Sequence, residues 1–174
     1  TPYYPGPGLG GHCIPIDPFY LTWKAKQYGI ETRFIELAGE VNTSMPNWVV
    51  DKAIEGLARQ GKRLADAQVL LLGLAYKKNV DDYRESPTLE LIRLFKLNES
   101  HVDYHDFYIS KLVRTRKYNY EMESVNLDAI SKYDIIILAT DHDEYDYDMI
   151  LKEAKLIVDT RGRYKNINDK IVKA

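Results

Sequence analysis

Short, largely apolar segments that alternate with helical patterns constrain the fold of this 174-residue chain more than any other feature. The runs at 69–72, 134–139 and 155–159 are dominated by leucine, isoleucine and valine. Such runs are typical of strands that are covered on both faces, as in parallel sheets. Further expected elements are helices at 87–97, 128–132 and 148–153 and strands at 101–105 and 170–172. Strands that alternate with helices predict an α/β domain with an open parallel, Rossmann-like sheet.

The amino-terminal part has a different character, since a glycine- and proline-rich loop is followed by helical patterns. Asp17 and Pro18 predict a helix start, with Asp17 as the cap and Pro18 at the first helical position. Gly29 predicts the end of this helix. We therefore expect two parts: residues 1–61 as part of an α-helical central domain, and residues 62–174 as the α/β domain.

A second helix is predicted to begin near Ser44 and Pro46 and to end at Gly61. Its apolar residues form a stripe of the kind that packs against another element. We expect this stripe to contact another helix, within the chain or across a two-fold axis between two copies. The stripe consists of Trp48, Val49, Ala53, Ile54 and Leu57.

Composition and charge exclude several classes of function. Hydrophobic residues make up 45% of the chain and charged residues 29%, as in soluble globular proteins that bury a core. The net charge of −2 argues against nucleic acid or an anionic membrane as partner, and no apolar run approaches the ~18 residues of a membrane helix. The single cysteine, Cys13, cannot form an intrachain disulfide, which favours a reducing, cytoplasmic environment.

Ligands of open parallel sheets bind beyond the carboxyl ends of the strands. In this chain the rule selects four segments, at 75–78, 105–106, 140–143 and 160–163. The first and last are basic, which suits phosphate. The middle two are acidic, and we expect them to discourage an anion beside them. The alternative is that these loops are polar only because they lie at the surface.

A complete dinucleotide-binding module is not expected in this chain. Its fingerprint requires three glycines between a strand and a helix. Only Gly73 follows the predicted strand at 69–72, and no strand precedes the glycine-rich run at 5–11.

Cys13 lies in a setting that suggests chemistry. It follows Gly10, Gly11 and His12, where the backbone can approach a substrate closely. It also precedes a helix start, whose exposed N–H groups favour a thiolate. Asp17 is close enough in sequence to hold or activate a water, although the cap role also explains it. The alternative for Cys13 is the usual one for a lone cysteine, a small and unreactive buried side chain.

Three blocks of sequence carry a resemblance to a known family. They are GLGGHCIPIDPFYL at 8–21, GLAYKK at 73–78 followed by DYRESP at 82–87, and DTR at 159–161. In order and spacing they resemble the UDP-glucose/GDP-mannose dehydrogenase family over nearly the whole chain. The first block, with histidine before the cysteine and Ile-Pro-Ile-Asp-Pro after it, is similar to the branch that acts on UDP-N-acetylhexosamines, such as UDP-N-acetylglucosamine or UDP-N-acetylmannosamine.

The resemblance implies an NAD-dependent enzyme that oxidises C6 of the sugar from alcohol to carboxylate in two hydride transfers. Cys13 captures the intermediate aldehyde as a thiohemiacetal, which is oxidised to a thioester and then hydrolysed. Asp17 assists water or proton transfer. The product, a UDP-hexosaminuronate, supplies surface polysaccharide. The resemblance also implies a homodimer or larger homo-oligomer, and an amino-terminal Rossmann domain that binds most of the NAD, without which the chain is expected to be inactive.

The resemblance also assigns substrate contacts. Tyr76 and Lys77 correspond to a substrate-contacting pair, with Lys77 at the pyrophosphate, and Arg161 corresponds to a further contact. The segment that wraps the uridine and ribose consists of Tyr4, Pro5, Gly6, Pro7, Gly8, Leu9 and Gly10.

Contacts to NAD are assigned in the same way to Cys13 and Arg84. The alternative for Arg84 is a surface ion pair with Asp82 or Glu85. Ile16 stands where many relatives have a lysine, so a polar contact to NAD is absent or replaced by packing.

Three alternatives stay open. Within the family, the substrate could be UDP-glucose instead. A second class is a nucleotide-sugar-binding module without chemistry. A third is a metal site, since His101, Asp103 and His105 share one face of a predicted strand and residues 141–143 follow another. No compact ligand motif such as His-Glu-x-x-His is present, so we expect no metal.

Overall fold

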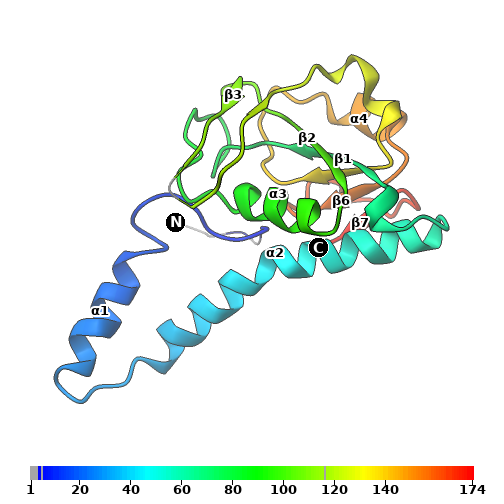
Figure 1. Ribbon diagram of the computed structural model, residues 1–174. Helices are drawn as coiled ribbons and strands as arrows, with labels where there is room; N and C mark the ends of the chain where they lie inside the picture. Colours follow the sequence, from blue (N-terminus) through cyan, green and yellow to red (C-terminus); the bar gives the residue numbers. More distant parts are fainter. Residues whose placement is uncertain (1–3, 5, 116) are drawn as a thin grey trace.

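A five-stranded sheet of order β2-β1-β5-β6-β7 forms the centre of the chain, and all neighbouring strands in it are parallel. The computed structural model describes residues 4, 6–115 and 117–174. Helices lie on both faces of the sheet, and two helices precede it (Figure 1). The predicted α/β class with an open parallel sheet is therefore confirmed.

The predicted elements of this sheet lie where the apolar runs placed them. Their bounds are β1 Gln68–Leu72, α3 Pro87–Leu97, β2 His101–His105, the 3-10 helix η2 Leu127–Lys132, β5 Ile135–Leu138, α4 Tyr147–Glu153, β6 Ile157–Asp159 and β7 Ile171–Lys173. A short 3-10 helix, η1 Leu64–Asp66, precedes β1, and an antiparallel pair that the sequence did not predict joins β3 Lys111–Leu112 to β4 Met122–Glu123.

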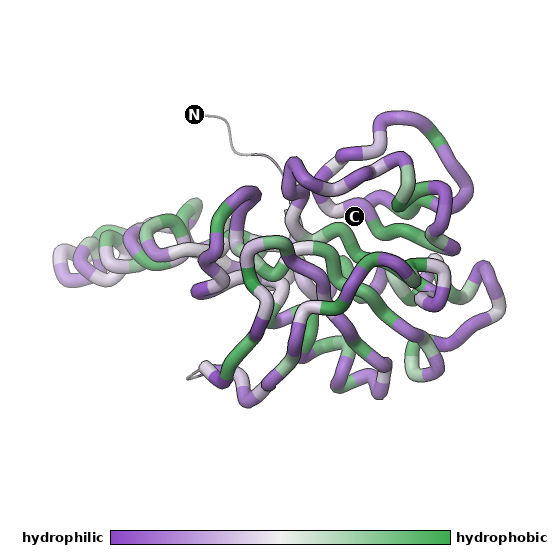
Figure 2. Tube along the Cα trace, turned by 90° about the horizontal axis from the view of Figure 1, so that it is seen from above, coloured by the Kyte–Doolittle hydropathy of each residue, from purple (hydrophilic) through white to green (hydrophobic). Residues whose placement is uncertain are grey.

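Each central strand divides its side chains between two cores. In β1, Val69 and Leu71 pack with α2 and α3, whereas Leu70 and Leu72 pack with η2 and α4. Successive residues of a strand point to opposite faces, so a run without polar residues fits only a strand with both faces covered. The tube in Figure 2 shows these strands as hydrophobic segments inside a mostly polar periphery.

The order of the strands creates a switch point. β1 pairs with β2 on one side and with β5 on the other. The chain therefore adds β2 on one side of β1 and then crosses over to add β5, β6 and β7 on the other side. Open α/β sheets bind ligands at the carboxyl ends of the two strands that flank such a point. A ligand-binding site is therefore expected at the loops after β1 and β5.

Helices α1 (Asp17–Lys26) and α2 (Arg33–Arg59) lie before the sheet. The α1 helix and the first half of α2 form an arm that projects from the α/β body (Figure 1). A side chain at Gly39 would lie 2.3 Å from the Phe19 ring, so the two helices touch directly at this glycine. None of the described helices is long and apolar enough to cross a membrane.

The second half of α2 belongs to the α/β core. Val49, Ala53 and Leu57 are fully buried against α3 and the β6–β7 side of the sheet, while Trp48 and Ile54 are 48% and 41% exposed. The predicted contact of this stripe with another helix is confirmed for the three buried residues. Because α2 runs from the arm into this core, the division of the chain at residue 61 stays a prediction.

The start predicted for the second helix was wrong. α2 begins at Arg33 rather than near Ser44, and Pro46 lies inside it. Proline has no N–H to donate to the carbonyl of Asn42, which weakens a helix locally. The residues before it include glutamate, leucine and alanine, which form helices well, and they pack on α1. These contacts outweigh the start signal.

Both predicted helix ends are confirmed. Gly29 and Gly61 have φ of +73° and +70°, the left-handed conformation that glycine adopts after a helix. After Gly61 the N–H of Lys62 donates to the carbonyl of Leu57 at 3.0 Å, which closes the last turn of α2.

The buried half of α2 can be tested by truncation. Leu57→Ala should lower the free energy of unfolding by about 2–5 kcal/mol, because it leaves a cavity between α2 and the sheet. The control is Ile54→Ala on the exposed side of the same helix, which should cost less than about 1 kcal/mol. Urea unfolding followed by circular dichroism measures both, and equal losses for the two variants would contradict the described packing.

Candidate functional site

A cavity of about 1010 Å³ opens at the carboxyl ends of β1, β5 and β6. Three parts of the chain form its walls: the glycine-rich loop, the projecting half of α2, and the loops that follow the strands. The α2 wall is apolar, with Phe34, Leu37, Val41 and Met45. The opposite wall is cationic and includes Lys77, Lys78, Arg161, Arg163 and Lys165, with Asp141 as the acidic residue among them.

Most of the substrate contacts assigned by resemblance line this cavity. They are Tyr4, Gly6, Gly8, Leu9, Gly10, Tyr76, Lys77 and Arg161. Pro7 is buried beside it, and Pro5 lies outside the described residues. Cys13, Asp17 and Arg84 do not line it, although Ile14, next to the cysteine, does. The roles of all these residues stay predictions.

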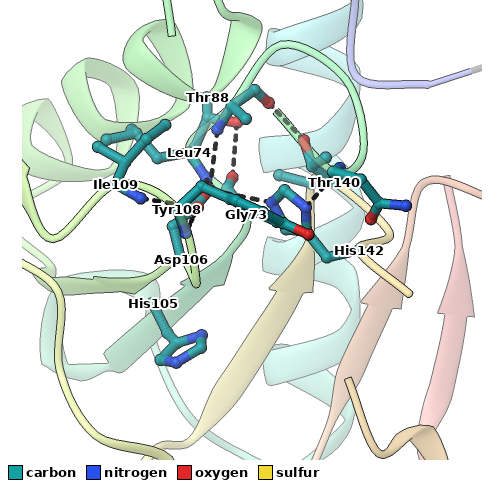
Figure 3. Close-up of polar contacts among 12 residues, drawn as sticks. Gly73, Leu74, Thr88, His105, Asp106, Tyr108, Ile109, Thr140 and His142 are labelled. Atoms are coloured by element: carbon teal, nitrogen blue, oxygen red, sulfur yellow. Dashed lines mark hydrogen bonds and ion pairs between the residues drawn. The ribbon is translucent and has the colours of Figure 1, made fainter. Parts of the chain in front are cut away.

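A buried carboxylate holds the loop after β1 in place (Figure 3). Oδ2 of Asp106 accepts the N–H groups of Leu74 and Ala75 at 2.7 and 3.0 Å, and Oδ1 accepts those of Tyr108 and Ile109 at 2.8 and 3.1 Å. Four backbone donors thus converge on one side chain. The carboxylate ties the end of β1 to the end of β2.

His142 completes this cluster from the end of β5. Its Nε2 lies 3.0 Å from Oδ2 of Asp106, and both side chains are fully buried. Its Nδ1 accepts the N–H of Asn79 at 2.9 Å, so the ring proton resides on Nε2 and points at the carboxylate. Burial by itself raises the pKa of Asp106, but the bonds from His142 and from the N–H groups of Ala75 and Tyr108 outweigh it and hold this pKa below its ordinary value.

A second buried aspartate shapes the loop after β6. Oδ1 of Asp159 accepts the N–H groups of Arg161 and Arg163, both at 3.1 Å. Its Oδ2 accepts the N–H of Tyr164 at 2.9 Å and the ammonium of Lys173 at 2.6 Å. Burial by itself raises the pKa of Asp159. The ammonium of Lys173 and the backbone donors lower it by more, so the net shift of this pKa is downward. The loop that carries Arg161 is therefore rigidly attached to the sheet.

Arg161 has donors that the described residues do not satisfy. Its Nε donates to the carbonyl of Ala139 at 2.6 Å, whereas the buried Nη2 has no hydrogen-bond partner among the described residues. Burial lowers the pKa of its guanidinium, and the nearby charge of Asp141 offsets this only in part. A buried cation with a free donor is costly unless an anion pairs with it. The group is thus suited to an anionic ligand in the cavity.

Two of the carboxylates at the acidic strand ends are paired with donors, so the expectation that they discourage an anion stays a prediction. Asp106 is buried and its oxygens are occupied by donors. Asp143 pairs with Lys78 at 2.9 Å, and this contact lowers the pKa of the aspartate. Paired carboxylates add little net field. The charged residues that line the cavity are five cations and Asp141, so the charge of its wall is positive on balance.

Close backbone contacts join the glycine-rich loop to the strand-end loops. A side chain at Gly10 would lie 2.6 Å from Cβ of Tyr76 and 2.7 Å from the carbonyl oxygen of Glu85. Gly11 has φ of +86°, and a side chain there would lie 2.9 Å from the Tyr76 ring. The N–H of Gly11 donates to the carbonyl of Arg84 at 3.2 Å. Only glycines permit this approach.

Cys13 is exposed and lies one turn before α1. The cap position is Ile16, and Asp17 is the first helical residue without a cap bond from its side chain, so the predicted capping role was wrong. The reason is that the N–H of Asp17 donates to the carbonyl of Cys13 at 2.8 Å, which draws Asp17 into the helix. Nor are the first N–H groups of α1 free to favour a thiolate, since Phe19 also donates to a backbone carbonyl, that of Ile16.

Arg84 lies in an ion pair. Its Nη2 and Nε donate to Oδ2 of Asp82 at 2.7 and 3.1 Å, and this pair lowers the pKa of Asp82. The surface ion pair considered for Arg84 is therefore present. Its side chain is two-thirds exposed, so the pair is open to solvent and is easily exchanged.

Several of the residues considered for a metal have other partners. Asp103 accepts from the hydroxyl of Tyr133 at 2.7 Å, and His105 contacts the hydroxyl of Tyr145 at 3.2 Å. His142 is committed to Asp106. Within residues 4, 6–115 and 117–174, no three acidic, histidine or cysteine side chains cluster as metal ligands would.

The sequence did not predict several residues of the site. The α2 wall was missed because the helix start was placed too late. Asn42, whose side chain accepts the N–H of Leu9 at 2.8 Å, was missed for the same reason. Arg163 was inside a segment selected as basic, and Asp141 was considered as an obstacle to anions or a metal ligand, but neither was assigned individually to the wall of a substrate cavity.

Fold and cavity together define an open α/β domain with a cation-lined cavity at the carboxyl ends of its strands. Comparison with known proteins agrees: residues 70–166 match the UDP binding domain of the UDP-glucose/GDP-mannose dehydrogenase family, and residues 1–44 match the central domain of the same family. The chain belongs to the UDP-glucose/GDP-mannose dehydrogenase family.

Individual relatives support this assignment. The chain is 32% identical over 165 residues to the NDP-N-acetyl-D-galactosaminuronic acid dehydrogenase of Ralstonia solanacearum, which covers 92% of this chain and 36% of the relative. It is 36% identical over 141 residues to the UDP-N-acetyl-D-mannosamine dehydrogenase of Methanocaldococcus jannaschii, covering 81% and 29%. The structure of the UDP-D-ManNAc dehydrogenase of Pyrococcus horikoshii superposes with a TM-score of 0.80 at 27% identity, over 98% of this chain and 39% of that one. The chain thus spans well under half the length of these relatives.

The contact between the glycine-rich loop and Tyr76 can be tested with one methyl group. Gly10→Ala should weaken binding of UDP by about tenfold, ~1.4 kcal/mol, because Tyr76 and the carbonyl of Glu85 have to move. Gly61→Ala is the control: it has a left-handed φ but nothing within 4 Å of the added carbon. It should cost about 1 kcal/mol of stability and leave UDP binding unchanged. Isothermal titration calorimetry with UDP measures the affinity, and equal effects of the two variants would contradict the described contact.

Proposed function

We propose that this chain is the nucleotide-sugar-binding and cysteine-bearing part of an NAD-dependent 6-dehydrogenase of UDP-N-acetylhexosamines. Such an enzyme oxidises C6 of the sugar to a carboxylate and yields a UDP-hexosaminuronate, a building block of surface polysaccharide. The observation that carries the proposal is one cavity that joins a substrate loop, the cations Lys77 and Arg161, and the neighbourhood of Cys13.

The cations support a diphosphate ligand. Lys77 is exposed at the cavity wall and has no ion pair among the described residues, while the buried Nη2 of Arg161 lacks a partner there. A diphosphate offers several anionic oxygens that can accept from both groups at once. The planar guanidinium suits two parallel bonds to phosphate, whereas the ammonium acts as a point charge. A nucleotide sugar satisfies both donors with its central pyrophosphate.

The loop around Cys13 supports the chemical role. The sulfur is exposed, and the neighbouring Ile14 reaches the cavity, so the sulfur is available to a sugar that extends from the pyrophosphate. In the proposed reaction the sulfur of Cys13 adds to the C6 aldehyde and forms a thiohemiacetal. This adduct would lose a hydride to NAD and become a thioester, which a water molecule cleaves to the carboxylate and the free thiol. Asp17, exposed one helical turn away, is proposed to accept a proton from that water.

NAD would accept the hydrides in this chemistry, but the described residues do not build a cradle for it. The turn after β1 contains Gly73 with φ of +88°, and the space that its missing side chain leaves is filled by Thr140, at 2.4 Å from the ideal Cβ position. A phosphate therefore cannot approach the backbone there. Arg84 is the proposed contact to NAD, and it would have to exchange its bond with Asp82.

The names of the relatives favour an N-acetylhexosamine as the sugar. Two of them, from Ralstonia solanacearum and Methanocaldococcus jannaschii, are named for N-acetylated sugars. UDP-glucose is the second candidate, since a UDP-glucose dehydrogenase of Pyrobaculum islandicum superposes with a TM-score of 0.70 at 25% identity. Assembly as a homodimer or larger homo-oligomer and a cytoplasmic location complete the proposal.

The phosphate role of Lys77 predicts a loss of affinity. Lys77→Ala in the intact protein should weaken binding of UDP by ~1.5–3 kcal/mol, the contribution of a hydrogen bond to a charged group. Lys152→Ala is the control, because it removes an exposed lysine from α4, away from the cavity. Calorimetric titration with UDP in low and high salt measures both. An affinity that Lys77→Ala leaves unchanged would exclude the proposed contact.

The nucleophile role of Cys13 predicts a loss of product without a loss of binding. Cys13→Ala in the intact protein should abolish formation of UDP-hexosaminuronate from NAD and the UDP-N-acetylhexosamine, because no sulfur captures the aldehyde. Binding of UDP should be unchanged. Cys13→Ser should retain little activity and accumulate an adduct visible by mass spectrometry, since a serine alkoxide forms far less readily than a thiolate. Near-parental product formation by Cys13→Ala would show that Cys13 is not the nucleophile.

A further inference from the structure

The loop that carries Lys77 is fixed at nearly every residue around it, but not at Lys77 itself. The carbonyls of Gly73 and Ala75 accept the hydroxyls of Thr88 and Thr140 at 3.1 and 2.6 Å. The N–H of Tyr76 donates to the carbonyl of Asp82 at 3.0 Å. Figure 3 shows Thr88 and Thr140 on either side of this loop.

Asp106 and His142 supply the remaining ties, one on each side of Lys77. Asp106 binds the N–H groups of Leu74 and Ala75, before the lysine. His142 binds the N–H of Asn79, two residues after it. Both side chains are fully buried, so neither can touch a ligand. The bond between them joins the two ties into a single brace.

Asn79 forms a tight turn after Lys77. Its φ of +61° is a left-handed conformation, which asparagine adopts more readily than most residues because its side chain can form local hydrogen bonds. The side chain of Asn79 exchanges bonds with Asp143, at 2.6 and 3.1 Å. These contacts fix the turn that follows Lys77, and His142 provides the one contact to its backbone N–H among them.

We propose that the buried Asp106–His142 pair is a positioning element for nucleotide-sugar binding, which holds the loop at 74–79 so that Lys77 stays at the cavity wall. The inference rests on the proposed function, because Lys77 is taken as a ligand of the diphosphate. A pair with a structural role only would lower stability when broken but would leave the affinity for nucleotide unchanged.

Two substitutions of His142 separate its two bonds. The amide nitrogen of glutamine lies near the position of Nε2, so His142→Gln keeps the bond to Asp106 and loses the one to Asn79. The side-chain oxygen of asparagine lies near the position of Nδ1, so His142→Asn keeps the bond to Asn79 and loses the one to Asp106. In the intact protein, His142→Gln should weaken UDP binding about tenfold, within the range of coupling between contacting residues, and His142→Asn should restore most of the affinity.

The matched control lies at the opposite end of the same strands. Asp134, at the amino end of β5, accepts the N–H of Gln68 at the start of β1 at 2.9 Å and pairs with Lys62 and Lys155. Asp134→Ala removes a buried tie between β1 and β5 without approaching the cavity. It should lower the melting temperature as the His142 variants do, and it should leave the affinity for UDP unchanged.

A double-mutant cycle decides the question. If His142 acts through Lys77, the variant with both His142→Gln and Lys77→Ala binds UDP no more weakly than Lys77→Ala alone. Additive losses, or an unchanged affinity of His142→Gln with a lowered melting temperature, overturn the inference. Should His142→Gln not fold, His142→Asn alone carries the test: because it keeps the bond to Asn79, it should bind UDP nearly as well as the parent, and a loss as large as that of Lys77→Ala overturns the inference. If the parent protein itself does not bind UDP, the proposed function fails, whereas a loss for Lys77→Ala without a loss for His142→Gln refutes only the positioning role.

Discussion

One buried carboxylate holds together the end of the sheet at which the cavity lies. Asp106 receives four backbone N–H groups and the ring of His142, and its side chain is completely enclosed. A charge in such a place is tolerated only when every lone pair has a donor. The backbone segments and the histidine ring that supply those donors are thereby held in fixed positions. The ends of β1, β2 and β5 are thereby fixed relative to one another.

The same physical solution occurs three times around the sheet. Asp159 gathers three backbone N–H groups and Lys173 after β6, and Asp134 gathers the N–H of Gln68 and two lysines before β5. In each case burial alone would raise the pKa of the aspartate, and the donors reverse that shift. Two of the three aspartates stand next to the loops that carry cavity cations. Carboxylates inside the protein therefore arrange cations at its surface without neutralising them.

The fold was predictable because its signals are local. The run at 134–139 can only be a strand with both faces covered, and Leu89, Ile92 and Phe95 repeat at helical spacing and are buried as expected. The glycine ends of both helices were equally clear. The start of α2 was not, because Pro46 gives a local start signal that the packing of the preceding turns on α1 overrides.

The site was predictable only where a residue meets the ligand space directly. Lys77 and Arg161 follow strands and line the cavity, as the strand-end rule requires. Asp106 and His142 also follow strands, yet their role depends on partners more than 30 residues away in sequence, Leu74 for the first and Asn79 for the second. Nothing in the spacing of a sequence states whether a carboxylate will face solvent or backbone donors. Their acidic and polar character was therefore interpreted as an obstacle to anions rather than as the support of a cation.

The glycine-rich loop connects this braced region to the cysteine. Gly10 and Gly11 lie against Tyr76, whose own N–H is tied to the carbonyl of Asp82. Tyr76 thus contacts the rigid end of β1 through its backbone and the loop before Cys13 through its ring. Because Gly10 and Gly11 have no side chains, their backbone packs directly on Tyr76 with no space between them. A displacement of the β1 loop would therefore also displace the glycine-rich loop. The segment before Cys13 therefore packs against the same end of β1 that carries Lys77 and that the carboxylate of Asp106 holds in place.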